Sequence, residues 1–416
     1  SWPIHVFLFA LFPLLLLFAD NIKEIPLEDL LLPSLLSLLI IGILWIIIRI
    51  FIGGKKSALI ISIFIILWIS ISQIRLLSVD QTNVISFFGT NLFLIPIFTI
   101  IGIILVIYII KQNISKGSIP IINAISIVVF SFLVFEIVSY DLENNFEILS
   151  IDDYVEIPII QSNVVEKPDV YFIVLDAYSG DITLEQDYNY DNSEFKTELK
   201  NRGFVVQKPS YSNYPNTEFS MPSIMNMVYL DFLVSELGQD SQNKKPAIEL
   251  RKQNKVMKIF KENQYDVVSF SGGLNVDMTI ANKQFCGSIV NINSELYESF
   301  VYMYVPVSYL RTAFFENYHT DALECLFSTI KDYDRDVGTP SFLYAHMSLP
   351  HPPFIYDSAG NNVPDIFSDN RFDESLRNAY LEQLIFANKI TLEMIDSIQN
   401  RDANSVIILM SDHGGR

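Results

Sequence analysis

An acidic residue beside a histidine ends the last apolar run of the chain. Residues 406–416 read V-I-I-L-M-S-D-H-G-G-R, so a β-branched run stops at Asp412 and His413. A second run, V-Y-F-I-V-L-D, ends in Asp176. Such runs are typical of buried parallel strands, and open α/β sheets bind ligands beyond the carboxyl ends of their strands. We therefore expect Asp176, Asp412 and His413 to meet at one sheet edge and to bind a divalent cation.

Two candidate hydroxyl groups lie between these motifs, among those of the stretch S-N-Y-P-N-T-E-F-S-M-P-S-I-M-N. Thr217 precedes an apolar helical stretch, and Ser220 follows three residues later. A hydroxyl at a helix N-terminus suits attack on a phosphate or sulfate, because unpaired N–H groups and the positive end of the helix dipole lie there. The alternative is that Thr217 or Ser220 only caps the helix. Asp176 has a similar alternative, as an Asx-turn or N-cap residue of the kind that is common at strand ends.

Two histidines stand in F-L-Y-A-H-M-S-L-P-H-P-P-F. The prolines around His351 hold it in a rigid loop after a strand, which favours a substrate-facing imidazole. His346 falls within the strand itself, so we interpret it as structural.

Strands and helices alternate from Pro168 onward, which predicts an α/β sandwich with a mainly parallel sheet. The predicted strands are Val170–Leu175, Phe204–Gln207, Asp266–Ser271, Phe342–Met347 and Val406–Met410. The predicted helices are Ser193–Arg202, Pro222–Leu233, Ala247–Asn263 and Glu374–Gln399.

The composition separates an apolar first part from an acidic second part. We expect a membrane anchor at 1–140, a juxtamembrane linker at 141–167 and a catalytic domain at 168–416. The net charge of −19 argues against nucleic acid as a partner. The two cysteines, Cys286 and Cys325, either pair or remain thiols. The chain has no initiator Met and stops just after a candidate ligand pair, so we expect a fragment at both ends.

Five apolar segments approach the ~20 residues needed to cross a ~30 Å hydrocarbon core. They are Trp2–Ala19, Leu30–Ile52, Ser57–Leu77, Asn91–Ile110 and Ile119–Ser139. The loops that carry Arg49, Lys55 and Lys56, and later Lys111 and Lys116, are placed in the cytoplasm by the positive-inside rule. An odd number of spans then puts the acidic domain outside the cytoplasm of a multi-pass membrane protein.

The order of these motifs resembles the alkaline phosphatase superfamily. It is most similar to the membrane-anchored sulfatase-like branch, which includes lipoteichoic acid synthases and lipid A phosphoethanolamine transferases. The resemblance implies a multi-pass helical anchor followed by a sulfatase-like α/β sandwich. It also implies one divalent cation, Mn, Zn, Mg or Ca, bound by Asp176, Thr217, Asp412 and His413. Thr217 would be the metal-bound nucleophile and His351 a substrate contact and proton donor, and we expect Ser220 and Arg416 to contact the substrate too.

The expected function is a metal-dependent transferase or hydrolase. It would act on phospho-ester or sulfo-ester groups of envelope lipids or glycans through a covalent phospho-threonine. One alternative is a sulfatase, although no Cys stands in the S-M-P-S segment and Ile224 replaces the arginine of the sulfatase motif. The other alternative is a non-catalytic envelope scaffold with a degenerate site.

Overall fold

A computed structural model of the chain describes residues 2–25, 27–78, 91–115, 117–143, 167–207, 211–272, 278–286, 308–333, 338–363 and 374–415. Arg416 and most of the expected linker lie outside these ranges. The contacts divide the chain into two compact units. The first comprises Ser1–Asn145 and Asn291–Arg311, and the second comprises Phe146–Val290 and Thr312–Arg416.

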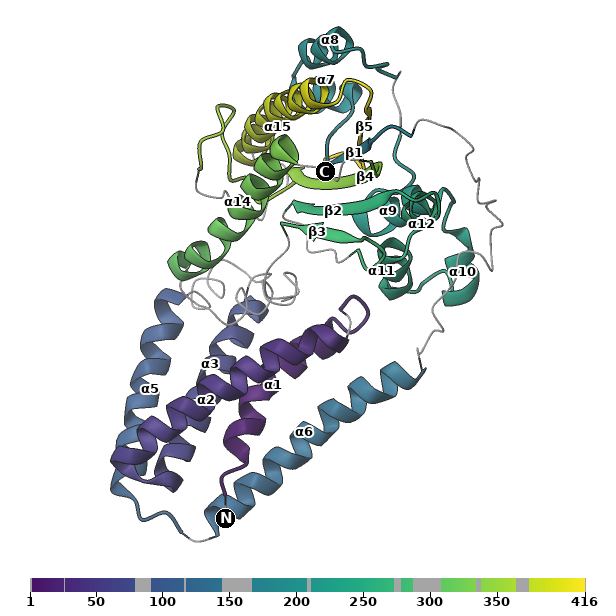
Figure 1. Ribbon diagram of the computed structural model, residues 1–416. Coiled ribbons are helices and arrows are strands. Elements are labelled where there is room, and N and C mark those ends of the chain that lie inside the picture. The colour runs from purple at the N-terminus through teal and green to yellow at the C-terminus, as the bar shows by residue number, and fades with distance from the viewer. Residues whose placement is uncertain are drawn as a thin grey trace. The chain divides into compact units, whose positions relative to one another are not determined.

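The first unit is built from long apolar helices (Figure 1). They are α1 (His5–Asp20), the short η1 (Leu27–Leu30), α2 (Leu31–Ile52), α3 (Gly54–Ser78), α5 (Asn91–Lys111) and α6 (Ser118–Glu143). Within the described residues, four helices are long and apolar enough to cross a membrane, namely α2, α3, α5 and α6. Helix α1 has 16 residues. At ~1.5 Å per residue it is shorter than a ~30 Å hydrocarbon core, so a fifth span stays a prediction.

Helix α1 is held by its neighbours inside this unit. Its Leu14 and Phe18 pack against Leu133 of α6 in one buried cluster. At its first residue, the His5 backbone N–H donates to Asn123 Oδ1 of α6 at 3.1 Å. An unpaired polar group in hydrocarbon is costly, so this pair fixes the start of α1 against α6.

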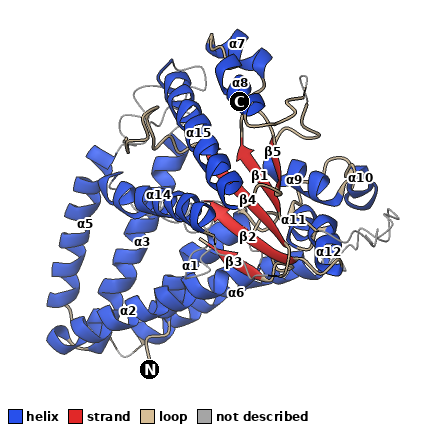
Figure 2. Cartoon of the chain, turned by 45° about the horizontal axis from the view of Figure 1, so that its top comes forward, coloured by secondary structure: helices blue, strands red, loops and turns tan. Residues whose placement is uncertain are grey.

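The second unit is an α/β domain around a parallel sheet (Figure 2). Its strands are β1 (Val170–Asp176), β2 (Asp266–Gly272), β3 (Lys283–Phe285), β4 (Ser341–Pro350) and β5 (Val406–Ser411), in the order β3-β2-β4-β1-β5. All four strand pairings are parallel. The predicted architecture of apolar helices followed by a mainly parallel α/β domain is confirmed. In parallel sheets all carboxyl ends lie at one edge, so β1, β4 and β5 deliver their last residues to the same place.

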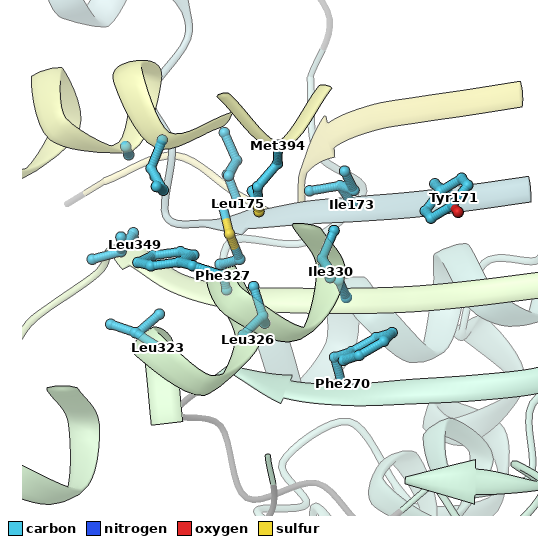
Figure 3. Packing of buried hydrophobic residues seen from close by; sticks show 14 of the residues in the cluster. Tyr171, Ile173, Leu175, Phe270, Leu323, Leu326, Phe327, Ile330, Leu349 and Met394 are labelled. Atoms are coloured by element: carbon cyan, nitrogen blue, oxygen red, sulfur yellow. The ribbon is translucent and has the colours of Figure 1, made fainter. Parts of the chain in front are cut away.

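Alternate residues of the strands face opposite layers of helices. On one face, Ile173 and Leu175 of β1 pack with Leu326 of α14 (Ser308–Asp332) and Met394 of α15 (Glu374–Arg401), as Figure 3 shows. On the other face, Val174 packs with residues of α9 (Thr217–Asn226) and α12 (Lys255–Glu262). The remaining helices that the structure describes in this domain are α7 (Asp181–Tyr188), α8 (Ser193–Asn201), α10 (Asp231–Leu237) and α11 (Lys245–Lys252).

Asp169 ties together the starts of three strands. Its Oδ1 accepts a hydrogen bond from the Ser341 backbone N–H at 2.7 Å, at the first residue of β4. Its carbonyl accepts from the Val406 N–H at 2.9 Å, at the first residue of β5. The starts of β4 and β5 are therefore both bonded to the residue that precedes β1.

Three of the predicted elements differ in the structure. Residues 204–207 form no strand. Phe204 and Val206 instead pack against the buried cluster that α8 and α15 form, and Val205 is exposed. The predicted helix 222–233 is instead α9 and α10, separated at Met227, whose φ of 59° ends α9. The predicted helix 247–263 is broken into α11 and α12, because the Asn254 side chain caps α12 by accepting from Met257 N–H.

The two cysteines are joined in a disulfide. Cys286 follows β3 and Cys325 lies on α14, and their Cα atoms are 5.5 Å apart. The bond links the edge of the sheet to the helix that covers it, across 39 residues of sequence. Neither cysteine is left as a thiol.

Candidate metal centre

Asp176 is the last residue of β1 and is buried. The chain turns sharply after it, since Ala177 has a φ of 58°, in the left-handed region that disfavours residues with a Cβ. Two hydrogen bonds hold this turn: Ala177 N–H donates to Asp412 Oδ1 at 3.1 Å, and the Tyr380 hydroxyl donates to the Ala177 carbonyl at 2.8 Å. The turn therefore connects the β1 end to the residues after β5.

Asp412 and His413 directly follow β5, and both are buried. The Asp412 carbonyl accepts from the buried Ser220 hydroxyl at 2.6 Å. His413 Nδ1 lies 2.8 Å from the Gly414 carbonyl, which requires the proton on Nδ1. Nε2 then carries a lone pair, and it lies 3.4 Å from Asp176 Oδ1. This orientation, with a carbonyl behind the ring, is the usual one for a metal-binding histidine.

Thr217 is the first residue of α9, and Asn216 is its N-cap. Its hydroxyl is therefore not in the capping position that the sequence left open. Oγ1 lies 2.7 Å from Asp412 Oδ2, 3.2 Å from His413 Nε2 and 3.4 Å from Asp176 Oδ1. The structure thus brings together Thr217 and the three residues expected to bind the cation.

His346 also lies at this site, although it was interpreted from the sequence as structural. It is buried on β4, with Nε2 3.7 Å from Asp412 Oδ2. Nδ1 lies 3.2 Å from the Tyr344 hydroxyl, whereas Nε2 is buried without a hydrogen-bond partner. Burial lowers the pKa of His346 to about 4, so the imidazole is neutral and Nε2 can offer a lone pair.

The charges of the site fit a divalent cation. Asp176, His346 and Asp412 each offer a ligand atom, and these atoms lie within 4.8 Å of one another. Burial, followed by the charge of Asp412, raises the pKa of Asp176 to about 8. Burial opposes ionisation of Asp412, yet its pKa lies below the usual value, and the hydrogen bonds that its carboxylate accepts from the Thr217 hydroxyl and the Ala177 N–H favour the ionised form. Two buried carboxyl groups that share one proton carry a net negative charge, which a bound cation would neutralise. Oxygen and imidazole ligands together suit Zn or Mn.

The remaining expected site residues have different environments. His351 lies in the loop after β4, is partly exposed, and its Nδ1 is 2.6 Å from the Pro352 carbonyl. Ser220 is fully buried, and its hydroxyl donates to the Asp412 carbonyl, so it helps to position that ligand. Arg416 lies outside the described residues.

Gln383 of α15 holds the His351 loop in place, a role that the sequence did not predict. Its Nε2 donates to the carbonyls of His351 at 2.9 Å and Pro353 at 3.2 Å. Its Oε1 accepts from Ile355 N–H at 2.9 Å. Gln383 lies about thirty residues from these partners in sequence, and no local pattern marks a polar residue that helps a distant loop.

The comparisons with known proteins agree with this geometry in one respect. A family model described as Sulfatase matches residues 168–416, which is more than half of the chain. No curated protein matches. One solved structure, the integral membrane protein lipooligosaccharide phosphoethanolamine transferase A from Neisseria meningitidis, is 13% identical and aligns over 98% of this chain and 82% of its own. The TM-score of this alignment is 0.38. On the family match, which spans all the site residues named above, the chain belongs to the sulfatase family.

Proposed function

We propose that this protein is a metal-dependent enzyme that transfers or hydrolyses phospho-ester groups of envelope lipids or glycans. The observation that carries the proposal is the position of Thr217, whose hydroxyl at the start of α9 touches Asp412, His413 and Asp176. A bound cation would lower the pKa of this hydroxyl and neutralise charge on the attacked group. Asp176, Asp412, His413 and the newly found His346 are the proposed ligands.

Each residue has a defined part in the proposed reaction. Thr217 Oγ1 forms a bond to phosphorus while the bond from phosphorus to the leaving oxygen breaks, which leaves a phospho-threonine. Asp412 Oδ2 accepts the hydroxyl's hydrogen bond at 2.7 Å, and it would take up the hydroxyl proton as the bond to phosphorus forms. The N-terminus of α9 adds unpaired N–H groups and a positive dipole end for the transferring oxygens. His351 protonates the departing oxygen, and water or an acceptor hydroxyl then releases the group from Thr217.

The sulfatase alternative is less well supported by this chain. A formylglycine enzyme needs a cysteine at the nucleophile position, whereas Cys286 and Cys325 are joined to each other and Thr217 occupies the site. A degenerate scaffold is also disfavoured, because the carboxylates, imidazoles and hydroxyl converge.

We further propose that the α/β domain lies outside the cytoplasm and acts on a membrane-linked substrate. The basic loop between α2 and α3, with Arg49, Lys55 and Lys56, favours that topology. The disulfide Cys286–Cys325 also supports it, because disulfides persist in oxidising compartments. Helices long enough to span the membrane would keep the site near lipid-linked donors.

The test is turnover by the full chain in detergent, with 4-nitrophenyl phosphate, bis(4-nitrophenyl) phosphate and 4-nitrophenyl sulfate as probes and with metal analysis. We expect phospho-ester turnover that a chelator abolishes, and a phosphorylated Thr217 peptide after rapid acid quenching. Thr217→Ala should lose turnover and keep its melting temperature, whereas Thr217→Ser should retain part of it. A Thr217→Ala variant as active as the parent would refute the nucleophile, and faster turnover of the sulfate would favour the sulfatase alternative.

A further inference from the structure

Arg251 lies at the end of α11, beside the helix that carries the proposed nucleophile. The carbonyl of the preceding residue, Leu250, accepts from Asn226 Nδ2 of α9 at 2.9 Å. Asn226 Oδ1 in turn accepts from the Lys255 backbone N–H at 2.9 Å. Asn226 is fully buried, and its bonds fix the chain on both sides of Arg251 against α9.

The guanidinium of Arg251 has no partner among the described residues. Its Nε is buried and makes no hydrogen bond, and no carboxylate forms an ion pair with it. Other described arginines differ: Arg202 binds Asp396 through two nitrogens, and Arg401 donates to backbone carbonyls. The neighbouring Lys252 pairs with Glu249. A buried donor of a charged group that lacks an acceptor is costly, and such a group calls for an explanation.

The positive charge of Arg251 acts on Tyr344, which lies two residues before His346 on β4. Burial raises the pKa of the Tyr344 hydroxyl, and the Arg251 guanidinium opposes that shift. Residues 344 and 346 share a strand face because side chains alternate along β4, and Tyr344 belongs to the buried cluster that includes Met221 and Met225 of α9. Arg251 thus approaches the centre from the α9 side of the sheet.

We propose that Arg251 binds the anionic oxygens of the ester group held at the metal centre. A guanidinium donates in a planar fork that matches two oxygens of a phosphoryl group, and it stays charged at every working pH. One cation cannot contact all the non-bridging oxygens, so a phosphate ester leaves an anionic oxygen for this donor. The assignment rests on the proposed function and narrows it, because it selects an ester that keeps a negative charge while bound.

The test measures anion binding separately from turnover. Inorganic phosphate is titrated by calorimetry into the full-length, metal-loaded protein in detergent, as the parent and as Arg251→Met, Arg251→Lys and Lys252→Met. Hydrogen bonds to charged groups contribute ~1.5–3 kcal/mol, so we expect Arg251→Met to weaken phosphate binding about 10- to 100-fold. Arg251→Lys should recover part of this affinity. Lys252→Met, which removes the adjacent charge from the same helix, should bind phosphate like the parent. Metal content and melting temperature should be equal in all four proteins.

Two outcomes would overturn the assignment. One is equal phosphate affinity in the parent and Arg251→Met; tighter metal binding in that variant would then mean that Arg251 only balances the carboxylates. The other is no phosphate binding by either protein. If phosphate binding depends on Arg251 but no ester is turned over, the assignment stands and the proposed function fails.

Discussion

Removing the metal should make the α/β domain less stable as the pH rises, through Asp176. Burial and the nearby Asp412 carboxylate raise the pKa of Asp176 from 3.8 to about 8. The metal-free folded protein therefore keeps a proton on Asp176 that the unfolded chain releases near pH 4. Because the folded state binds the extra proton, stability is full below pH 4 and is lost progressively as the pH rises toward about 8.

The size of the effect follows from the same shift. At pH 7 the folded carboxyl is still mainly protonated, about three pH units above the point where the unfolded chain ionises. At ~1.36 kcal/mol per unit, the metal-free protein loses on the order of 4 kcal/mol of unfolding free energy. For a domain of roughly 250 residues this corresponds to a fall in melting temperature on the order of 10 °C. Asp176→Asn imitates the protonated carboxyl, so it should remove most of this loss while it abolishes metal binding and turnover.

The measurement is thermal unfolding of the full chain in detergent from pH 5 to 8, with and without a chelator. We expect the chelated parent to melt at progressively lower temperature as the pH rises, and the chelated Asp176→Asn variant to change little. Asp240→Asn, which alters an exposed carboxylate, is the matched control and should behave like the parent. A chelated parent whose melting temperature is flat across this range, and equal to that of Asp176→Asn, would refute the account of the buried carboxylate pair.

Three further results are expected. Gln383→Met should lower kcat by up to about 10-fold, because the hydrogen bonds that hold the His351 loop are lost. In a His351→Ala background the same change should have little effect on kcat. An undiminished effect there would assign Gln383 a general structural role. Cys286→Ser should cost up to about 4 kcal/mol of unfolding free energy, from the loop entropy of the 39-residue separation, and reduction of the parent should lower melting similarly; no change in either would contradict the disulfide. Protease added to intact cells should remove the α/β domain, and full protection beside a cleaved external control would invert the topology.

The sequence was sufficient to predict the candidate ligands that stand next to strand ends. Asp176 and the pair Asp412-His413 each follow a continuous apolar run, and a parallel sheet brings such positions to one edge. His346 was missed because it lies inside its strand, where alternation gives two faces but not which face carries the site. That choice depends on the register of β4 against β1, in which Val174 lies opposite His346, and register is a long-range property.

Neither the position of Arg251 nor the break before α12 was predicted, for a related reason. Residues 247–263 have the pattern of one helix, and only Asn254, through its bond to Met257 N–H, divides it. The break fixes where Arg251 lies, and Asn226 then secures it from another helix. A local pattern cannot report a bond between side chains and backbone far apart in the chain.

The bonds of Asp169 have a consequence at the opposite end of the sheet. Asp169 joins the first residues of β4 and β5, while the proposed ligands lie at the far end of β1, inside β4 and just beyond β5. At ~3.3 Å per residue, a strand that shifts by one position moves its ligand by more than a metal–ligand bond length of ~2 Å and turns it to the other face. Asp169 can therefore influence metal affinity across the length of a strand without touching the ion. Short insertions near the strand starts should be as harmful to the site as changes in the ligands themselves.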